Sequence, residues 1–127
     1  MIQEDKILLL KDLSTRLPYG VKAYVKNWSK LDRKYYEGVY TVESTHPSLN
    51  TVLAYSDKFS VEVIVGYDEY DIKPYLFPMS EMTEEQYKQY VKYSAIESID
   101  WLNKNHFDYR GLIKKGLAID ATNLNIY

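Results

Sequence analysis

The chain contains no cysteine, and this absence removes several kinds of chemistry. Disulfide bonds, thiolate zinc sites and a cysteine nucleophile are all excluded. Small secreted domains are usually held together by disulfides, and no apolar signal-peptide core follows the first six residues. We therefore expect a cytoplasmic protein.

Long apolar runs are also missing. The longest uncharged apolar run near the N-terminus, Ile7 to Leu10, is much shorter than the ~20 residues that a membrane-spanning helix needs. We expect no membrane span.

Histidine and glycine are scarce, which limits the possible active sites. A serine-type triad needs a histidine between a nucleophile and a carboxylate, and neither His46 nor His106 lies in such a context. The spacing of His106 and Asp108 supplies two metal ligands where a site needs three or four. The five glycines are scattered singly, so no phosphate-binding loop is present. We expect no catalytic residue, metal or cofactor.

Three carboxylates stand close together at Asp68, Glu69 and Asp71. Such oxygen ligands suit calcium, but the glycine and the final glutamate of an EF-hand loop are absent. The pattern is more typical of a solvated acidic loop.

The length of 127 residues and the net charge of −2 indicate one domain, residues 1–127, with no strong overall attraction to nucleic acid. The charges are nevertheless segregated along the chain. Basic residues dominate from Arg16 to Lys34, and acidic residues dominate from Asp57 to Glu85. We expect two neighbouring faces that keep the surface solvated.

Tyrosine is abundant, with 14 residues against 3 phenylalanines. A tyrosine ring packs while its hydroxyl stays in water, so tyrosine suits the boundary of a thin sheet or helix layer. It is equally typical of binding interfaces.

The front half of the chain predicts one helix followed by strands. Leu9, Leu13 and Leu17 recur at helical spacing in residues 3–17. Alternating residues predict strands, and short connections favour an antiparallel arrangement. The expected strands are 21–26, 36–43, 51–55 and 59–65, with a loop at 27–34 and a hairpin turn at Ser56-Asp57-Lys58.

Residues 72–78 contain Pro74 and Pro78, which suit an edge segment or a turn and not a central strand. The fold class we predict is α+β: a small antiparallel sheet or SH3-like barrel of 4–5 strands, with an N-terminal helix and 2–3 C-terminal helices.

Two capping boxes mark the C-terminal helices. Thr83 with Gln86, and Ser94 with Glu97, each have the spacing in which side chains cap a helix reciprocally. They predict helices at 84–93 and 95–105, although one kinked helix is equally allowed. A single apolar stripe runs through both segments, formed by Tyr87, Val91, Ala95, Ile99 and Leu102. A further short helix is expected at 109–115, capped by Asp108 and ended by Gly116.

Rings and cations interleave around the first strand, as a surface that stacks bases and contacts phosphates would require. The candidate binding residues are Tyr19, Lys22, Tyr24, Lys26, Trp28, Lys30, Arg33 and Lys34. The alternation places Lys22, Tyr24 and Lys26 on the outward strand face.

Three strings resemble a family of small, uncharacterised proteins from phages and prophages of Bacteroides-type gut bacteria. They lie at residues 11–21, at residues 72–85 and at residues 101–113, so the resemblance covers most of the chain. The resemblance implies a phage or prophage origin. It supplies no activity, substrate or catalytic residue.

Three functional hypotheses follow. The first is a non-catalytic phage or prophage accessory protein that binds a protein partner or associates with itself. The second is a single-stranded nucleic-acid binder that uses the basic, aromatic strand face. The third is an enzyme with an unrecognised site, for which a buried His106 bonded to a carboxylate would be the anchor.

Overall fold

The computed structural model describes residues 1–57 and 59–127 and has an α+β fold, as predicted. It contains three α-helices, three 3₁₀ turns and seven strands within these residues. The helices are α1 (Gln3–Arg16), α2 (Glu84–Tyr90) and α3 (Ala95–Lys104), and the 3₁₀ turns are Leu17–Tyr19, Pro47–Leu49 and Met79–Glu81. The strands are β1 (Lys22–Ser29), β2 (Lys34–His46), β3 (Thr51–Tyr55), β4 (Ser60–Ile64), β5 (Tyr70–Pro78), β6 (Phe107–Asp108) and β7 (Ile119–Asp120).

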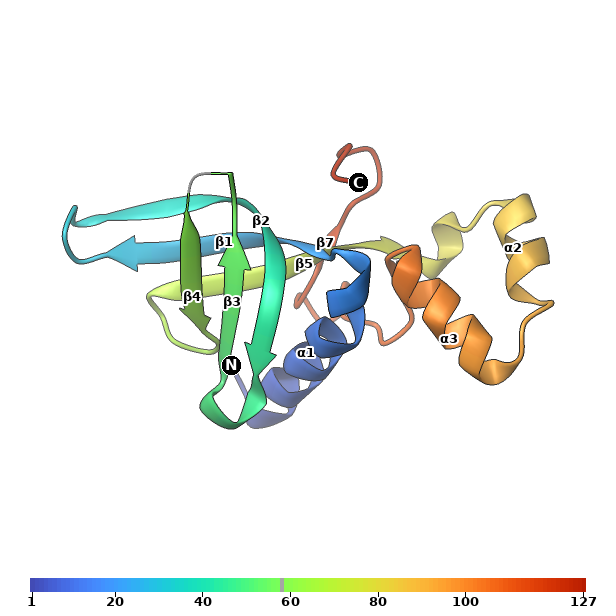
Figure 1. Ribbon diagram of the computed structural model, residues 1–127, viewed down its shortest axis with the longest axis horizontal. Coiled ribbons are helices and arrows are strands. Elements are labelled where there is room, and N and C mark those ends of the chain that lie inside the picture. The colour runs from blue at the N-terminus through green and yellow to red at the C-terminus, as the bar shows by residue number, and fades with distance from the viewer. Residues whose placement is uncertain (58) are drawn as a thin grey trace.

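One sheet contains all seven strands, in the order β4-β3-β2-β1-β5-β6, with β7 also paired to β5 (Figure 1). Strands β1 to β4 form an antiparallel meander, and β5 returns to lie antiparallel to β1. The two-residue strands β6 and β7 pair with β5 in parallel. The predicted hairpin of β3 and β4 is confirmed, while Lys58 of its turn lies outside the described residues.

The prediction of 4–5 strands is too low, because the C-terminal third adds β6 and β7 to the five longer strands. The barrel alternative is also wrong. Closure would require β4 to pair with β5, and the sheet in the described part of the chain remains open there.

Helix α1 lies beside the loop that joins β4 to β5. The Lys6 side chain passes so close to Gly66 that a Cβ atom there would collide with it, and Gly66 has a left-handed φ of +91°. This contact places the N-terminal part of α1 against the loop between β4 and β5.

The hydrophobic core lies between α1 and the inner sheet face. Leu9 and Leu13 of α1 are buried, as the helical spacing predicts. Val21, Ala23 and Val25 are buried on β1, as the alternation predicts. Leu102 of α3 is also buried, although it is not part of the core cluster of α1 and the sheet.

The first hairpin is longer than expected. Residues 27–34 were predicted as a loop, but β1 continues to Ser29 and β2 begins at Lys34, so only Lys30 to Arg33 form the turn. Cross-strand packing explains the extension, because the rings of Trp28 and Tyr35 stand opposite each other with centroids 5.0 Å apart.

The prediction for residues 72–78 is wrong, because β5 is paired on both edges. The Trp28 N–H donates to the Glu69 carbonyl (3.0 Å), so alternate residues from Glu69 to Tyr75 direct their backbone groups toward β1. Pro74 therefore directs its nitrogen to the opposite edge, where β7 pairs only from Tyr75 onward. Proline has no N–H group, but no strand pairs with β5 at Pro74 on that edge, so no hydrogen bond of the sheet is lost. Pro74 is therefore compatible with a strand that is paired on both edges.

Both predicted capping boxes are present, and they cap two separate helices. The predicted helix at 109–115 is wrong. The Asp108 carboxylate does accept the N–H groups of Leu112 and Ile113, both at 2.9 Å, but the chain then forms turns. Gly111 has a φ of +76°, and this left-handed residue interrupts any helix in its first turn.

None of the helices in the described residues is long and apolar enough to cross a bilayer.

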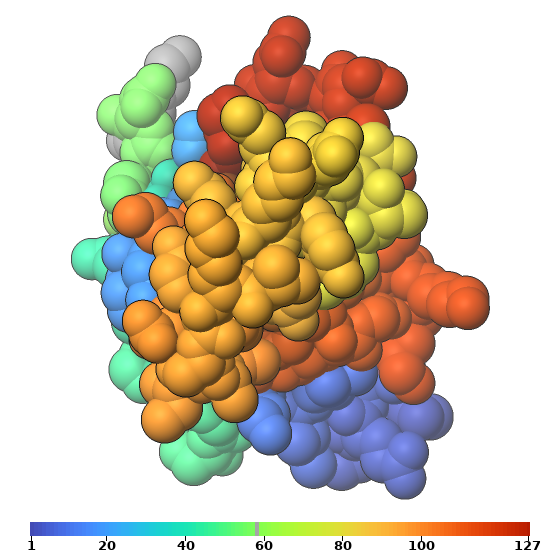
Figure 2. Space-filling view, turned by 90° about the vertical axis from the view of Figure 1, so that its right-hand side faces the viewer, coloured from blue at the N-terminus to red at the C-terminus, as the bar shows by residue number. Residues whose placement is uncertain are grey.

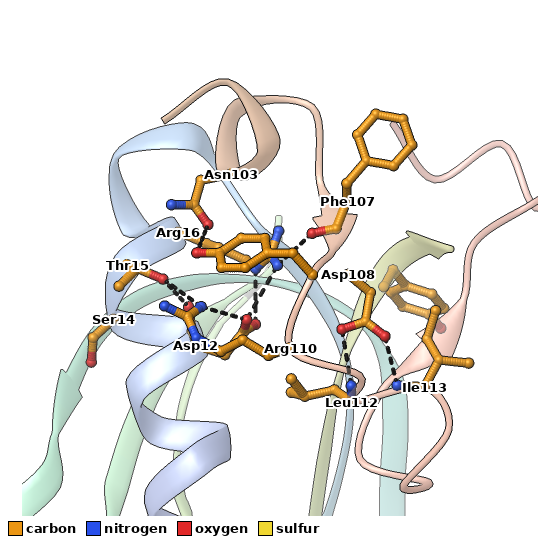
Figure 3. A network of polar contacts seen from close by, with 12 residues as sticks. Asp12, Ser14, Thr15, Arg16, Asn103, Phe107, Asp108, Arg110, Leu112 and Ile113 are labelled. Carbon is orange, nitrogen blue, oxygen red and sulfur yellow. Dashed lines mark hydrogen bonds and ion pairs between the residues drawn. The ribbon is translucent and has the colours of Figure 1, made fainter. Parts of the chain in front are cut away.

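A buried ionic cluster joins α1 to the segment after α3 (Figure 3). The Asp12 carboxylate accepts from Nε of Arg16 (2.8 Å) and from Nη1 of Arg110 (2.9 Å). Arg16 also donates to the Phe107 carbonyl (2.6 Å). The side chains of Asp12 and Arg16 are fully buried, so each charge relies on the other for compensation.

The ring of Tyr109 adds to this cluster. Both guanidinium groups lie near the ring, with Cζ of Arg16 at 5.3 Å and Cζ of Arg110 at 4.6 Å from its centroid. The Tyr109 hydroxyl donates to Oδ1 of Asn103 (2.9 Å), which links the cluster to α3. Helix α3 is thus linked to α1 through polar contacts.

We predict that Asp12→Asn lowers the free energy of unfolding by about 3–5 kcal/mol, because it leaves two guanidinium groups near the core without their counter-charge. Urea denaturation followed by circular dichroism measures this loss. The matched control is Glu84→Gln, which removes an exposed ion pair with Lys88 and should have little measurable effect. Equal stability of the two variants would contradict the role of the cluster.

Candidate functional site

The structure separates the eight predicted binding residues into three groups. Four of them, Lys22, Tyr24, Lys26 and Trp28, alternate along the outward face of β1, as the pattern predicts. Lys30 and Arg33 lie in the turn, and Lys34 begins β2. Tyr19 ends the 3₁₀ turn before β1, at the other end of that strand. The residues therefore do not form one compact site.

Acidic residues from the neighbouring strands flank the basic residues of β1. Lys26 stands opposite Glu37 of β2 and opposite Asp71 of β5. The Tyr24 hydroxyl donates to the Glu37 carboxylate. Burial, together with this bond, raises the pKa of Tyr24 to about 12. The sequence could not reveal these pairs, because they depend on the register of β1 with both neighbours.

The other end of this face is covered by the chain itself. Nζ of Lys22 donates to the Ile126 carbonyl (3.2 Å), and the ring of Tyr127 lies nearby. Lys22 is therefore engaged within the molecule, and the positive charge left on the outward face lies toward the turn.

The far end of the first hairpin keeps a basic and aromatic character. We call this end the hairpin tip, comprising Lys26, Trp28, Lys30, Arg33, Lys34 and Tyr35. Nζ of Lys26 lies 4.4 Å from the ring centroid of Tyr35, which itself packs edge-on against Trp28. Lys30, Arg33 and Lys34 are exposed. Cation–ring contacts of this kind hold the two types of side chain together.

A second surface, which the sequence did not indicate as a site, lies on the C-terminal helices. The predicted apolar stripe of α2 and α3 is mostly exposed, since of its members only Leu102 is buried. The exposed fractions are 57% for Tyr87, 55% for Val91 and 42% for Ile99. Ile96 of α3, which is not part of the predicted stripe, is 78% exposed. We call these four residues the apolar helix face.

The position of the helices explains this exposure. Helices α2 and α3 project from one end of the sheet, where they form the front of the molecule in Figure 2. Helix α2 has no buried residue, and α3 is attached by the residues near its C-terminal end, Leu102 and Asn103. The sequence predicted the apolar periodicity, but it did not show which part of the stripe contacts the core.

A third feature is a cleft of about 440 Å³ beside the ends of α2 and α3. Four rings line it, from Phe77, His106, Phe107 and Tyr127. Thr83, Gln86, Lys104 and Asn105 contribute polar groups. Its mixture of rings and a few polar groups is typical of a binding cleft.

His106 is one of the titratable groups that line this cleft, together with Glu81, Lys104 and Tyr127. It has a left-handed φ of +62°, and its ring stacks on Tyr127 with centroids 3.6 Å apart. Its Nδ1 atom is buried without a hydrogen-bond partner. Burial, reinforced by the charges of Arg16 and Lys22, lowers the pKa of His106 to about 4. The imidazole is therefore neutral at neutral pH.

The arrangement around His106 does not resemble a catalytic dyad. A general base needs a second group that orients it, and among the described residues no carboxylate bonds to the His106 ring. No group of three or more histidine, aspartate or glutamate side chains in residues 1–57 and 59–127 is arranged to hold a metal ion.

Comparisons of the chain with family models, with curated proteins and with solved structures found no match.

We predict that stability falls as the pH drops from about 6.5 toward about 4, in part because of His106. The unfolded chain binds a proton at this histidine throughout that window while the folded chain does not, so protons favour unfolding. His106→Asn, which tolerates the left-handed backbone, should reduce this pH dependence.

Urea unfolding at about pH 7.5 and about pH 5 measures the effect. His46→Asn, at the exposed end of β2, serves as the control. If both variants lose stability with pH as the unsubstituted chain does, the role assigned to His106 is wrong.

Proposed function

We propose that the protein is a non-catalytic phage or prophage accessory protein that binds a partner protein through the apolar helix face. The observation that supports the proposal is that α2 and α3 are fully capped but bury few of their apolar side chains. Both helices have complete capping boxes, yet Tyr87, Val91, Ile96 and Ile99 remain in water. Several large apolar side chains exposed on two consecutive helices are typical of a docking site.

The short length of the helices supports this interpretation. Isolated helices of 7 and 10 residues are marginal in water, so α2 and α3 depend on their caps and on the few residues that reach the core. A partner that covered the apolar helix face would add the burial that the fold itself does not supply. The tyrosine content of this region fits the same role, since tyrosine is enriched at interfaces.

The proposal does not rely on pairing between the basic and acidic segments of two molecules. Lys26 already stands between Glu37 and Asp71 of its own sheet, so opposite charges meet within one chain. Association through the apolar helix face should therefore depend only weakly on salt. A cytoplasmic location remains part of the proposal.

We predict that Val91→Lys combined with Ile96→Lys abolishes partner binding without unfolding the protein, because both side chains already face water. Affinity capture from the cells that produce the protein, followed by mass spectrometry, compares the variant with the unsubstituted chain. Leu49→Lys is the matched control, since Leu49 is 68% exposed on a distant 3₁₀ turn. Capture of the same proteins by all three chains would refute the proposed face.

A second candidate function is single-stranded nucleic-acid binding by the hairpin tip. The specific observation in its favour is the contact of Lys26 with Tyr35 beside Trp28, with three further cations exposed around the turn. Base stacking on such rings, with phosphate contacts from the cations, is how sequence-tolerant binders hold a strand. The negative charges of Glu37 and Asp71 would repel a phosphate backbone, so this candidate ranks second.

We predict for this candidate that Arg33→Glu with Lys34→Glu weakens binding of a labelled oligonucleotide at low salt, because two phosphate contacts are lost. Fluorescence anisotropy measures the affinity. Lys114→Glu with Lys115→Glu makes the same charge change on another exposed segment. Equal losses in both double variants, or no binding by the unsubstituted chain, would remove the hairpin tip as a nucleic-acid site.

A further inference from the structure

The ladder between β1 and β5 opens at one end, and a side chain fills the opening. The register of the two strands would place Lys22 opposite Tyr75. Instead, the Lys22 N–H donates to the hydroxyl oxygen of Tyr127 (2.9 Å), and the Tyr127 O–H donates to the Tyr75 carbonyl (2.8 Å). The tyrosine hydroxyl therefore takes the place of a direct bond between the strands.

The walls of this opening are fixed by contacts that do not involve Tyr127. The His106 carbonyl accepts from the Phe77 N–H (2.8 Å), and the His106 N–H donates to the Asn103 carbonyl (3.1 Å). The imidazole lies parallel to the Tyr127 ring, with an angle of 11° between them. The ring of Phe77 lies on another side, with its centroid 6.1 Å from that of Tyr127.

This opening is complementary to a phenol in shape and chemistry. It offers flat rings for stacking, one backbone donor from Lys22, and two backbone acceptors, the Tyr75 carbonyl (2.8 Å) and the Lys22 carbonyl (3.4 Å). Burial raises the pKa of Tyr127 to about 12, so the hydroxyl keeps the proton that it donates to Tyr75. We call this feature, formed by Lys22, Tyr75, Phe77 and His106, the tyrosine slot.

The segment that carries Tyr127 is lightly attached. We call residues 122–127 the strap. Its backbone is held by bonds from Thr122 to the Asp120 side chain, from Leu124 to the Ala121 carbonyl and from Lys22 to the Ile126 carbonyl. Asn123 and Asn125 adopt left-handed φ angles of 68° and 54°. These two residues lie between strand β7, which is paired in the sheet, and the specific contacts of Tyr127. A segment in this position can act as a hinge.

We propose that the tyrosine slot also binds the strap of a second copy of this chain, so that two molecules exchange Tyr127 reciprocally. Every copy carries both the slot and the segment that fits it, and the contacts made between molecules are identical to those made within one. Exchange of this kind requires only that the hinge change its direction, and it forms a symmetric dimer. This proposal concerns a different surface from the apolar helix face.

Cross-linking between two single-cysteine variants tests the exchange, because the chain has no cysteine of its own. Lys22→Cys and Ile126→Cys place thiols on the slot and on the strap, which touch in the structure. A mixture of the two should give a covalent heterodimer with a short bis-maleimide. Adding Tyr127→Ala to the strap variant should remove the product, because the ring that seats the strap is lost.

The matched control is a mixture of Ile126→Cys with Leu49→Cys, whose thiol is exposed far from the slot along the chain. A yield of covalent heterodimer from the first mixture that is well above the yield from this control mixture supports the exchange. Equal yields in both mixtures, or a yield that Tyr127→Ala does not change, would overturn it.

Peptide binding provides a second measurement. An amidated peptide of residues 122–127 should bind the full chain carrying Tyr127→Ala, while the unsubstituted chain competes through its own strap. The same peptide with phenylalanine in place of tyrosine should bind about tenfold more weakly, because it lacks the bridging hydroxyl. Equal binding of the two peptides, or no binding of either, contradicts the slot.

If Tyr127→Ala fails to fold, Tyr127→Phe replaces it, because the ring still stacks on His106 while the hydroxyl is absent. The tyrosine peptide should then displace the phenylalanine strap and bind this variant more tightly than it binds the unsubstituted chain. Binding no tighter than to the unsubstituted chain would overturn the proposal.

Discussion

The fold depends on the buried carboxylate of Asp12 between two arginines. Arg16 comes from the same helix, whereas Arg110 and the Phe107 carbonyl come from the other end of the chain. A carboxylate and a guanidinium removed from water are costly unless each is compensated, so this cluster tolerates few alternative arrangements. It fixes where the segment after α3 meets α1, and that junction in turn sets the positions of α3, His106 and β6.

Three segments that lie far apart in the sequence, residues 11–21, 72–85 and 101–113, meet around this junction. The first contains Asp12 and Arg16, the second contains most of β5, and the third contains Phe107, Asp108 and Arg110. Strand β5 pairs with β6 at Phe77 and Phe107, so these distant segments lie side by side. These segments assemble the fold, whereas the apolar helix face and the hairpin tip draw largely on other residues.

Local patterns predicted the parts of the structure that local forces determine. The spacing of Leu9 and Leu13, the alternation from Val21 to Val25 and the two capping boxes all translate directly into structure. Features set by contacts between distant segments could not be predicted. The pairing of β5 on both edges depends on which edge of the strand the nitrogen of Pro74 faces, and the position of Lys26 opposite Glu37 and Asp71 depends on the register of three strands. The tyrosine slot needs Lys22, Tyr75, His106 and Tyr127 together, and no local pattern connects them.

The distance along the chain between Asp12 and Arg110 also constrains how the protein can be made. During synthesis α1 leaves the ribosome long before its partners, and Arg110 follows Asp12 by 98 positions. Until Arg110 has been made, the charged side chains of α1 must stay hydrated. The buried leucines of α1 then lack those of their packing partners that come from later parts of the chain. Contacts of such long sequence separation form late and slowly. The nascent chain therefore completes its central ionic contact only after the 98 positions from Asp12 to Arg110 have been translated, and the partly made protein is exposed to misassembly or chaperone capture in the meantime.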